Sequence, residues 1–193
     1  GIYKDDLGLK IQKLNKKIKI LEKYKGELAL NLSDIKYGLR QIDKELREEG
    51  EYLHLQIVGG ASLLFNGIPE ATIDIDTITP IKGNVREIIY NSELDINDDA
   101  IEYIDNYEGL EFYEFDEEQY SNIIITYLST QGALYAKLKH VDPDKLDALA
   151  ESFDRIGVKI NKESIKEYFE DYGLEVDDRD LDRFLESQGL EER

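Results

Sequence analysis

Residues 53–80 restrict the fold of this 193-residue chain more than any other segment. The run LHLQIV predicts a strand, and the pair Gly59-Gly60 follows it directly. A short apolar helix is expected over 60–66, and a Gly-Ile-Pro break separates it from the strictly alternating, β-branched TIDIDTI. This order predicts two neighbouring strands of one sheet, joined by a glycine turn and a short helix.

Asp74 and Asp76 lie two residues apart on the second predicted strand, which spans 72–78. Period-two geometry points both carboxylates to one face, while Ile73 and Ile75 point to the core. Converging carboxylates repel each other unless a cation or solvent lies between them. Mg²⁺ is typically held by one or two carboxylates together with substrate phosphates. The sequence therefore predicts a magnesium site at Asp74 and Asp76.

Gly59 and Gly60 lie where the first strand turns into the helix, and Ser62 adds a hydroxyl in the first helical turn. Glycine allows the backbone to approach a ligand closely, and the N–H groups that begin a helix bind phosphate. An Asp-x-Asp or a Gly-Gly pair alone carries little weight in a chain with 43 acidic residues. Their order and spacing together predict a phosphate cradle beside a metal pair.

In this order the segment resembles the nucleotidyltransferase fold of the DNA polymerase β superfamily, in which an apolar-Gly-Gly motif precedes an Asp-apolar-Asp motif. VGGASLLFNGIPEATIDID is more closely similar to the AbiEii-like and minimal nucleotidyltransferase branch, which includes toxins of toxin–antitoxin pairs. INDDAIEYI and TQGALYAKLKHVDPDKLDALAESF resemble the downstream pattern of that branch. The resemblance covers roughly residues 36–170.

The resemblance implies a role for each matching position: triphosphate binding by Gly59, Gly60 and Ser62, Mg²⁺ binding by Asp74 and Asp76, and a phosphate contact by Lys137. It also implies a third carboxylate, for which Glu114 is the candidate, as a metal ligand or base. Relatives often carry a basic residue shortly before the aspartates, where this chain has Glu70. The implied reaction transfers a nucleoside monophosphate from an NTP to an acceptor hydroxyl on RNA or protein, and releases pyrophosphate.

Two alternatives stay open. The chain is either an active, toxin-like enzyme that pairs with an antitoxin, or a catalytically degenerate member of the fold that acts as a binding or assembly module. A nucleotide-binding sensor lies between these two readings.

We predict an α+β fold, with a small mixed β-sheet of the nucleotidyltransferase type flanked by helices and with helical extensions at both ends. Residues 31–128 are expected to form the α/β core, 1–30 an N-terminal amphipathic helix and 129–193 a C-terminal helical region. A helix that Ser33 or Asp34 can cap is expected to run to about Glu49. Further helices are expected at 84–91, 97–106, 131–140, 143–155, 162–171 and 178–188, and further strands at 110–115 and 123–128.

Apolar residues recur at heptad spacing from Leu7 to Leu28. A helix of this length is marginal by itself, so it is expected either to pack on the body or to form an oligomer seam through residues 7–28. The first 27 residues hold eight lysines against four acidic residues, whereas the whole chain has a net charge of −19. That balance argues against a large basic nucleic-acid footprint.

The remaining composition narrows the class of protein. No run approaches the ~20 apolar residues of a membrane-spanning helix, so no membrane partner is expected. The chain has no cysteine, which excludes disulfides and thiolate metal sites and suits a cytoplasmic location. The two histidines, His54 and His140, have no carboxylate partner at metal-ligand spacing and are expected to be structural.

Overall fold

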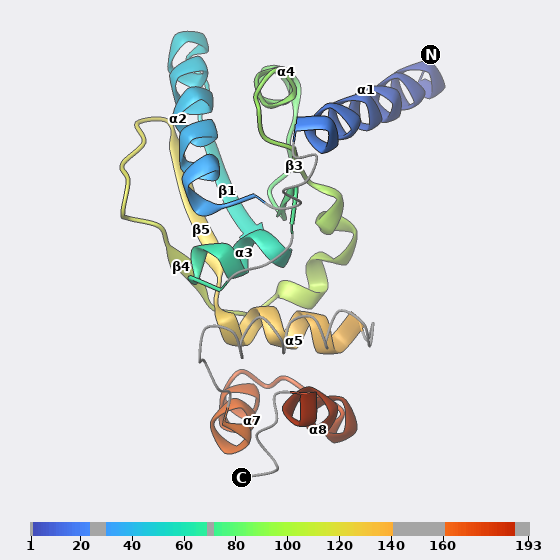
Figure 1. Cartoon of the computed structure of the whole chain (residues 1–193), viewed down its shortest axis with the longest axis vertical. Helices are drawn as coiled ribbons and strands as arrows, with labels where there is room; N and C mark the ends of the chain where they lie inside the picture. Colours follow the sequence, from blue (N-terminus) through green and yellow to red (C-terminus); the bar gives the residue numbers. More distant parts are fainter. Residues whose placement is uncertain (1, 24–29, 69–71, 141–160, 188–193) are drawn as a thin grey trace.

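The computed structural model describes residues 2–23, 30–68, 72–140 and 161–187 (Figure 1). These residues form an α+β fold around a five-stranded mixed sheet with the order β3-β2-β1-β5-β4, which confirms the predicted class. The strands are β1 (Leu53–Val58), β2 (Ile75–Thr77), β3 (Ile96–Asn97), β4 (Phe112–Glu114) and β5 (Ile123–Leu128).

The helices pack around this sheet. They are α1 (Ile2–Lys23), α2 (Leu32–Glu49), α3 (Gly59–Phe65), α4 (Gly83–Tyr90), the 3₁₀ helix η1 (Asp99–Tyr107), α5 (Thr130–His140), α7 (Lys162–Asp171) and α8 (Asp178–Ser187). Figure 1 shows α1, α2 and α4 toward one end of the molecule and α5, α7 and α8 toward the other. The predicted helix over 143–155 lies outside the described residues, as does Glu70.

Helix α2 illustrates how local sequence determines these elements. The Asn31 side chain caps the helix by accepting a hydrogen bond from the Asp34 N–H at 2.8 Å. Gly50 ends it in the left-handed conformation, at φ +66°. Four apolar residues at helical spacing form its buried face: Ile35, Leu39, Ile42 and Leu46.

The apolar interior consists of two clusters, and α3 belongs to both. Ala61 and Phe65 of α3 pack into the first cluster, together with residues of α2, α4 and β1. Leu63 packs into the second cluster, together with α5, α7 and α8. The short helix is therefore held from both sides, which fixes the position of the glycine turn that precedes it.

The strand predicted over 72–78 is shorter in the structure, because β2 contains only Ile75–Thr77. Side-chain hydroxyls take over the pairing with β1 at its end. The Thr77 hydroxyl donates to the Gln56 carbonyl at 3.0 Å, and the Thr79 hydroxyl accepts from the Gln56 N–H at 3.1 Å. At the other end, Asp74 lies in the bend just before the strand rather than within it, and the Thr72 hydroxyl donates to its carbonyl at 3.1 Å.

The helix predicted over 97–106 is wrong at its start. Ile96 and Asn97 form β3, which pairs in parallel with β2, and the 3₁₀ helix begins only at Asp99. Pairing with Ile75 leaves Ile96 only 7% exposed. The Asn97 side chain then accepts a hydrogen bond from the Asp99 N–H at 3.2 Å, and this local turn starts η1.

None of the helices in the described ranges combines the length and the apolar character needed to span a bilayer.

Candidate functional site

The glycine turn lies directly against Asp76 of the acidic pair. Val58, the last residue of β1, pairs with Asp76 of β2, and Gly59 is the next residue after Val58. Gly59 has φ +65°, and a Cβ built there would lie 2.6 Å from Asp76 Oδ2. Both the backbone conformation and the space therefore require glycine at this position. The structure brings together Gly59 and Asp76, as the sequence predicted.

Asp76 is electrostatically unfavourable in its charged form. Burial, and after it the negative charge of Asp74, raise its pKa from 3.8 to about 6. A hydrogen bond from Asn97 Nδ2 to Asp76 Oδ1, at 3.1 Å, opposes the shift. At neutral pH Asp76 is therefore mostly ionised, and both its burial and the neighbouring carboxylate make that charge unfavourable. A bound cation would relieve both effects.

Asn97 is a site residue that the sequence prediction missed. It pairs in register with Asp76, because β3 lies beside β2 in the sheet. The run Asp95-Ile96-Asn97 repeats the polar–apolar–polar alternation of the acidic strand. That alternation is the pattern that predicts a second strand here rather than a helix.

Helix α1 brings positive charge to the acidic side of the sheet. Lys13 Nζ lies 3.3 Å from Asp99 Oδ1, and Lys16 donates a hydrogen bond to the Ile89 carbonyl. Burial lowers the pKa of Lys16 to about 8, although the charge of Asp95 opposes the shift. These contacts join residues 86 and 73 positions apart. No local pattern in the sequence predicts them.

A cavity of about 70 Å³ lies between α1 and β3. Lys13 and Lys16 line it from the helix, and Asn97 lines it from the strand. The two lysines therefore share a cavity with the residue whose side chain donates a hydrogen bond to Asp76.

Ser62 makes a structural contact within α3 and is not exposed to a ligand. It is fully buried, and its hydroxyl donates to the Gly59 carbonyl at 2.6 Å. The hydroxyl thus stabilises the first turn of α3 from the inside. Gly60 is half-buried in the same turn. Lys137 is half-buried on α5, the helix that contacts both α3 and η1.

The structure does not bring Glu114 to the acidic pair. Glu114 lies on β4, at one edge of the sheet, and its side chain is exposed. Two strands, β1 and β5, separate β4 from β2, which corresponds to roughly 14 Å between the outer two strands. Among the residues that the structure describes, no three His, Cys, Asp or Glu side chains gather closely enough to hold a metal ion.

Helix η1 closes another side of the site. It contacts β2, and its last residue, Tyr107, is half-buried. Burial raises the pKa of the Tyr107 hydroxyl, and the charge of Asp76 adds to the shift. Tyr107 is therefore a neutral hydroxyl within electrostatic range of the carboxylate at neutral pH.

Comparisons of the chain with protein-family models, with curated proteins and with solved structures found no match. The function is therefore inferred from the geometry around Gly59, Asp74 and Asp76.

The raised pKa of Asp76 has a measurable effect on stability. The native state binds a proton at Asp76 more tightly than the unfolded state does. The stability that Asp76 contributes is therefore complete below about pH 4 and is lost as the pH rises through about 6. Replacing it, as Asp76→Asn, should raise the free energy of unfolding at neutral pH by about 2 kcal/mol.

Urea unfolding at about pH 4.5 and about pH 7.5 checks this expectation. The stabilisation should be larger at the higher pH. The exposed Asp116 provides the matched control, since Asp116→Asn should change the stability little at either pH. A variant Asp76→Asn that is less stable than the parent at pH 7.5 would show that the carboxylate is not a site of electrostatic stress.

Proposed function

We propose that the chain is a Mg²⁺-dependent nucleotidyltransferase, which transfers a nucleoside monophosphate from an NTP to an acceptor hydroxyl on RNA or on a protein. The observation that carries this proposal is the close approach of the Gly59 backbone to the Asp76 carboxylate. A single triphosphate reaches both a backbone cradle and a metal-binding carboxylate only where the two are adjacent. The order of the two motifs along the chain, which carries the family resemblance, is a second support for the proposal.

The residues present fit Mg²⁺. Asp74 and Asp76 offer hard oxygen ligands, and Mg²⁺ usually takes one or two carboxylates and completes its coordination with waters and substrate phosphates. When bound, it offsets the negative charge that the phosphates carry during transfer. The hydrogen bond from Asn97 leaves one oxygen of Asp76, Oδ2, on the side of Gly59.

The chain's own residues would bind and orient the triphosphate. Gly59 and Gly60 present backbone without side chains at the start of α3. Lys13 and Lys16 bring positive charge to the adjacent β3 side of the sheet. Glu70 stands where relatives often carry a basic residue before the aspartates. The two lysines would supply positive charge for triphosphate binding in its place.

We extend the proposal to a toxin-like role with an antitoxin as partner, because the family resemblance includes toxins of such pairs. Mg²⁺, an NTP and an acceptor are then the expected reactants. In a cell, the acceptor that receives the nucleotide would lose its normal activity.

One observation favours a second candidate, a catalytically degenerate binding or assembly module. Within the described residues, the register neighbours of Asp76 are Val58 on β1 and the amide Asn97 on β3, and the acidic Glu114 lies across the sheet. An acceptor hydroxyl would then lack a carboxylate base in this part of the chain. Such a protein would bind a nucleotide without turning it over.

Calorimetric titration of Mg²⁺ with each NTP in turn tests the proposal. The parent protein should bind at least one NTP in the presence of Mg²⁺, and Asp76→Ala should weaken this binding by about tenfold or more. Asp116→Ala, an exposed change of the same chemistry, should leave it unchanged. No NTP binding at millimolar concentration, with an intact fold, would overturn the proposal.

Pyrophosphate release in the same samples separates the two candidates. An active transferase releases pyrophosphate from the NTP that it binds when an RNA or protein acceptor is supplied. Binding without release supports the degenerate module.

A further inference from the structure

Helix α1 contacts the body of the protein with its polar side and leaves its apolar side exposed. Lys13 and Lys16 reach Asp99 and the Ile89 carbonyl, as described above. The four described seam residues of the heptad pattern remain between 45% and 60% exposed: Leu7, Ile11, Leu14 and Ile18. The packing of α1 on the body therefore leaves the apolar seam of the heptad pattern unburied.

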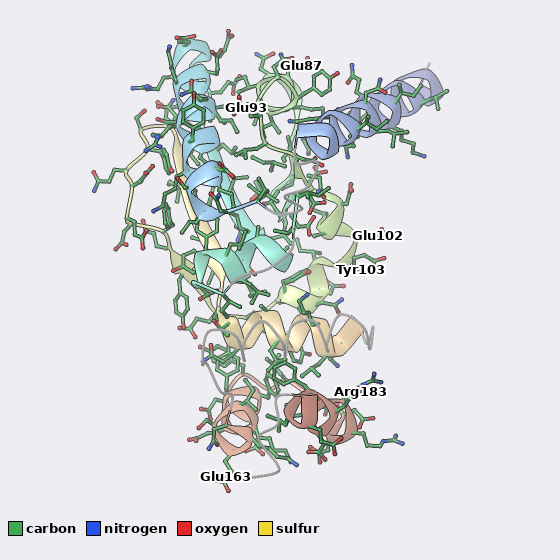
Figure 2. The ribbon with its side chains drawn as sticks, in the orientation of Figure 1. Glu87, Glu93, Glu102, Tyr103, Glu163 and Arg183 are labelled. Carbon is green, nitrogen blue, oxygen red and sulfur yellow. The ribbon has the colours of Figure 1, made fainter. Side chains whose placement is uncertain are left out.

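A groove of about 590 Å³ lies between α2 and α4. The half-buried Ile88 of α4 and the ring of Tyr37, which is 52% exposed, supply its apolar surface, and Ile42 of α2 also lines it but is only 1% exposed. Four exposed carboxylates also line it: Glu45, Glu49, Glu87 and Glu93. Figure 2 shows Glu87 and Glu93 on the α4 side of this groove. Among the described residues that line it, none is a lysine or an arginine.

We infer that this groove binds α1 of a second copy of the chain, with the apolar seam turned inward. The groove and the helix are complementary in two independent respects. The groove combines apolar residues with glutamates, and the helix combines an apolar seam with lysines on its flanks. An amphipathic helix that lies in an apolar groove is a recurrent mode of protein recognition.

The occupant comes from another copy because α1 is already held within its own chain. The side of α1 that carries Lys13 and Lys16 packs against α4 and β3, so its seam points away from its own body. Two copies related by a twofold axis exchange helices reciprocally, and each dimer then contains two identical contacts. This inference does not depend on the proposed activity.

Pairing the two α1 seams with each other is less favourable. In the heptad pattern, Lys10 and Lys17 occupy the positions directly before Ile11 and Ile18. An antiparallel pair of α1 helices would place these lysines beside each other, and like charges at such positions oppose pairing. The glutamates of the groove instead offer the lysines opposite charges.

Two double variants of the full chain test the inference. The arm variant, Ile11→Asp with Leu14→Asp, changes exposed residues of α1, and the groove variant, Glu45→Lys with Glu49→Lys, changes exposed residues of α2. Sedimentation velocity at up to about 100 μM should show a dimer for the parent and at least a tenfold weaker association for each variant. Circular dichroism checks that both variants stay folded.

The matched control is Glu163→Lys with Glu167→Lys on α7, which makes the same change of charge at the same helical spacing on an exposed surface away from the groove (Figure 2 labels Glu163). It should dimerise like the parent. A parent that stays monomeric at 100 μM, or a groove variant that dimerises like the control, would overturn the inference.

Mixing the arm variant with the groove variant distinguishes docking in the groove from pairing of the seams. The groove variant still carries an intact α1, and the arm variant still carries an intact groove, so the mixture retains one of the two contacts. It should associate more tightly than either variant alone. If the mixture associates no better than the separate variants, the groove is not the binding site.

Discussion

Replacing Gly59 by alanine is expected to destabilise the protein by about 3 kcal/mol and to abolish nucleotide binding. Gly59 lies at φ +65°, where an L-residue costs about 1–2 kcal/mol. The new Cβ would also lie 2.6 Å from Asp76 Oδ2, so the carboxylate would have to rotate away. That rotation breaks its 3.1 Å hydrogen bond to Asn97 and removes the carboxylate from the glycine turn.

Urea unfolding measures the loss of stability, and Gly109→Ala is the matched control. Gly109 has φ +77°, but a Cβ there would meet no atom within 4 Å. It should therefore lose only the backbone contribution, about 1 kcal/mol. The difference between the two variants isolates the contact with Asp76.

A double-mutant cycle sharpens this expectation. In an Asp76→Ala background, Gly59→Ala no longer meets a carboxylate oxygen, so it should cost about as much as Gly109→Ala does. Equal costs for Gly59→Ala in both backgrounds would show that the glycine is required by its backbone conformation alone.

Replacing Asp43 by alanine should also reduce the free energy of unfolding by about 3 kcal/mol. Asp43 lies on α2 and is only 6% exposed. Its carboxylate accepts hydrogen bonds from the Asn122 N–H at 2.7 Å, and from the N–H and hydroxyl of Ser121 at 3.2 and 3.3 Å. Alanine would leave these donors of the segment before β5 without their buried acceptor.

The effect should extend to β1, because the same segment also fixes the start of that strand. The Asn122 carbonyl accepts a hydrogen bond from the Leu53 N–H at 2.9 Å, and the Asn122 side chain donates to the Glu51 carbonyl at 2.8 Å. Amide exchange at Leu53 should therefore accelerate in Asp43→Ala. Glu48→Ala, an exposed change on the same helix, should leave both exchange and stability near those of the parent. A loss below 1 kcal/mol in Asp43→Ala would contradict the expectation.

Local sequence patterns were sufficient for most of the fold. The strand predicted over 53–58 and the helix predicted over 162–171 have the same bounds in the structure. Both are determined by residues close in sequence, such as the Asn161 side chain, which caps α7 through the Ser164 N–H. The alternation in TIDIDTI correctly predicted a strand, but the threonine hydroxyls that pair at its C-terminal end bond to another strand.

The candidate site was predictable only where its parts follow one another along the chain. Gly59 and Asp76 meet because β1 and β2 are consecutive antiparallel strands. Asn97 joins them through the parallel pairing of β2 with β3, and the α1 lysines arrive through packing across more than 70 positions. Glu114 is an acid on a predicted strand, but the order of strands within a sheet is not encoded in any single strand.

The sheet also limits how copies of this chain can associate. Its two edge strands, β3 and β4, are only two and three residues long. Such short edges expose few unpaired backbone N–H and C=O groups, so they are poor templates for a strand from another chain. A chain with these edges is protected against edge-to-edge aggregation, and its copies would recognise each other through helices and side chains rather than by extending a common sheet.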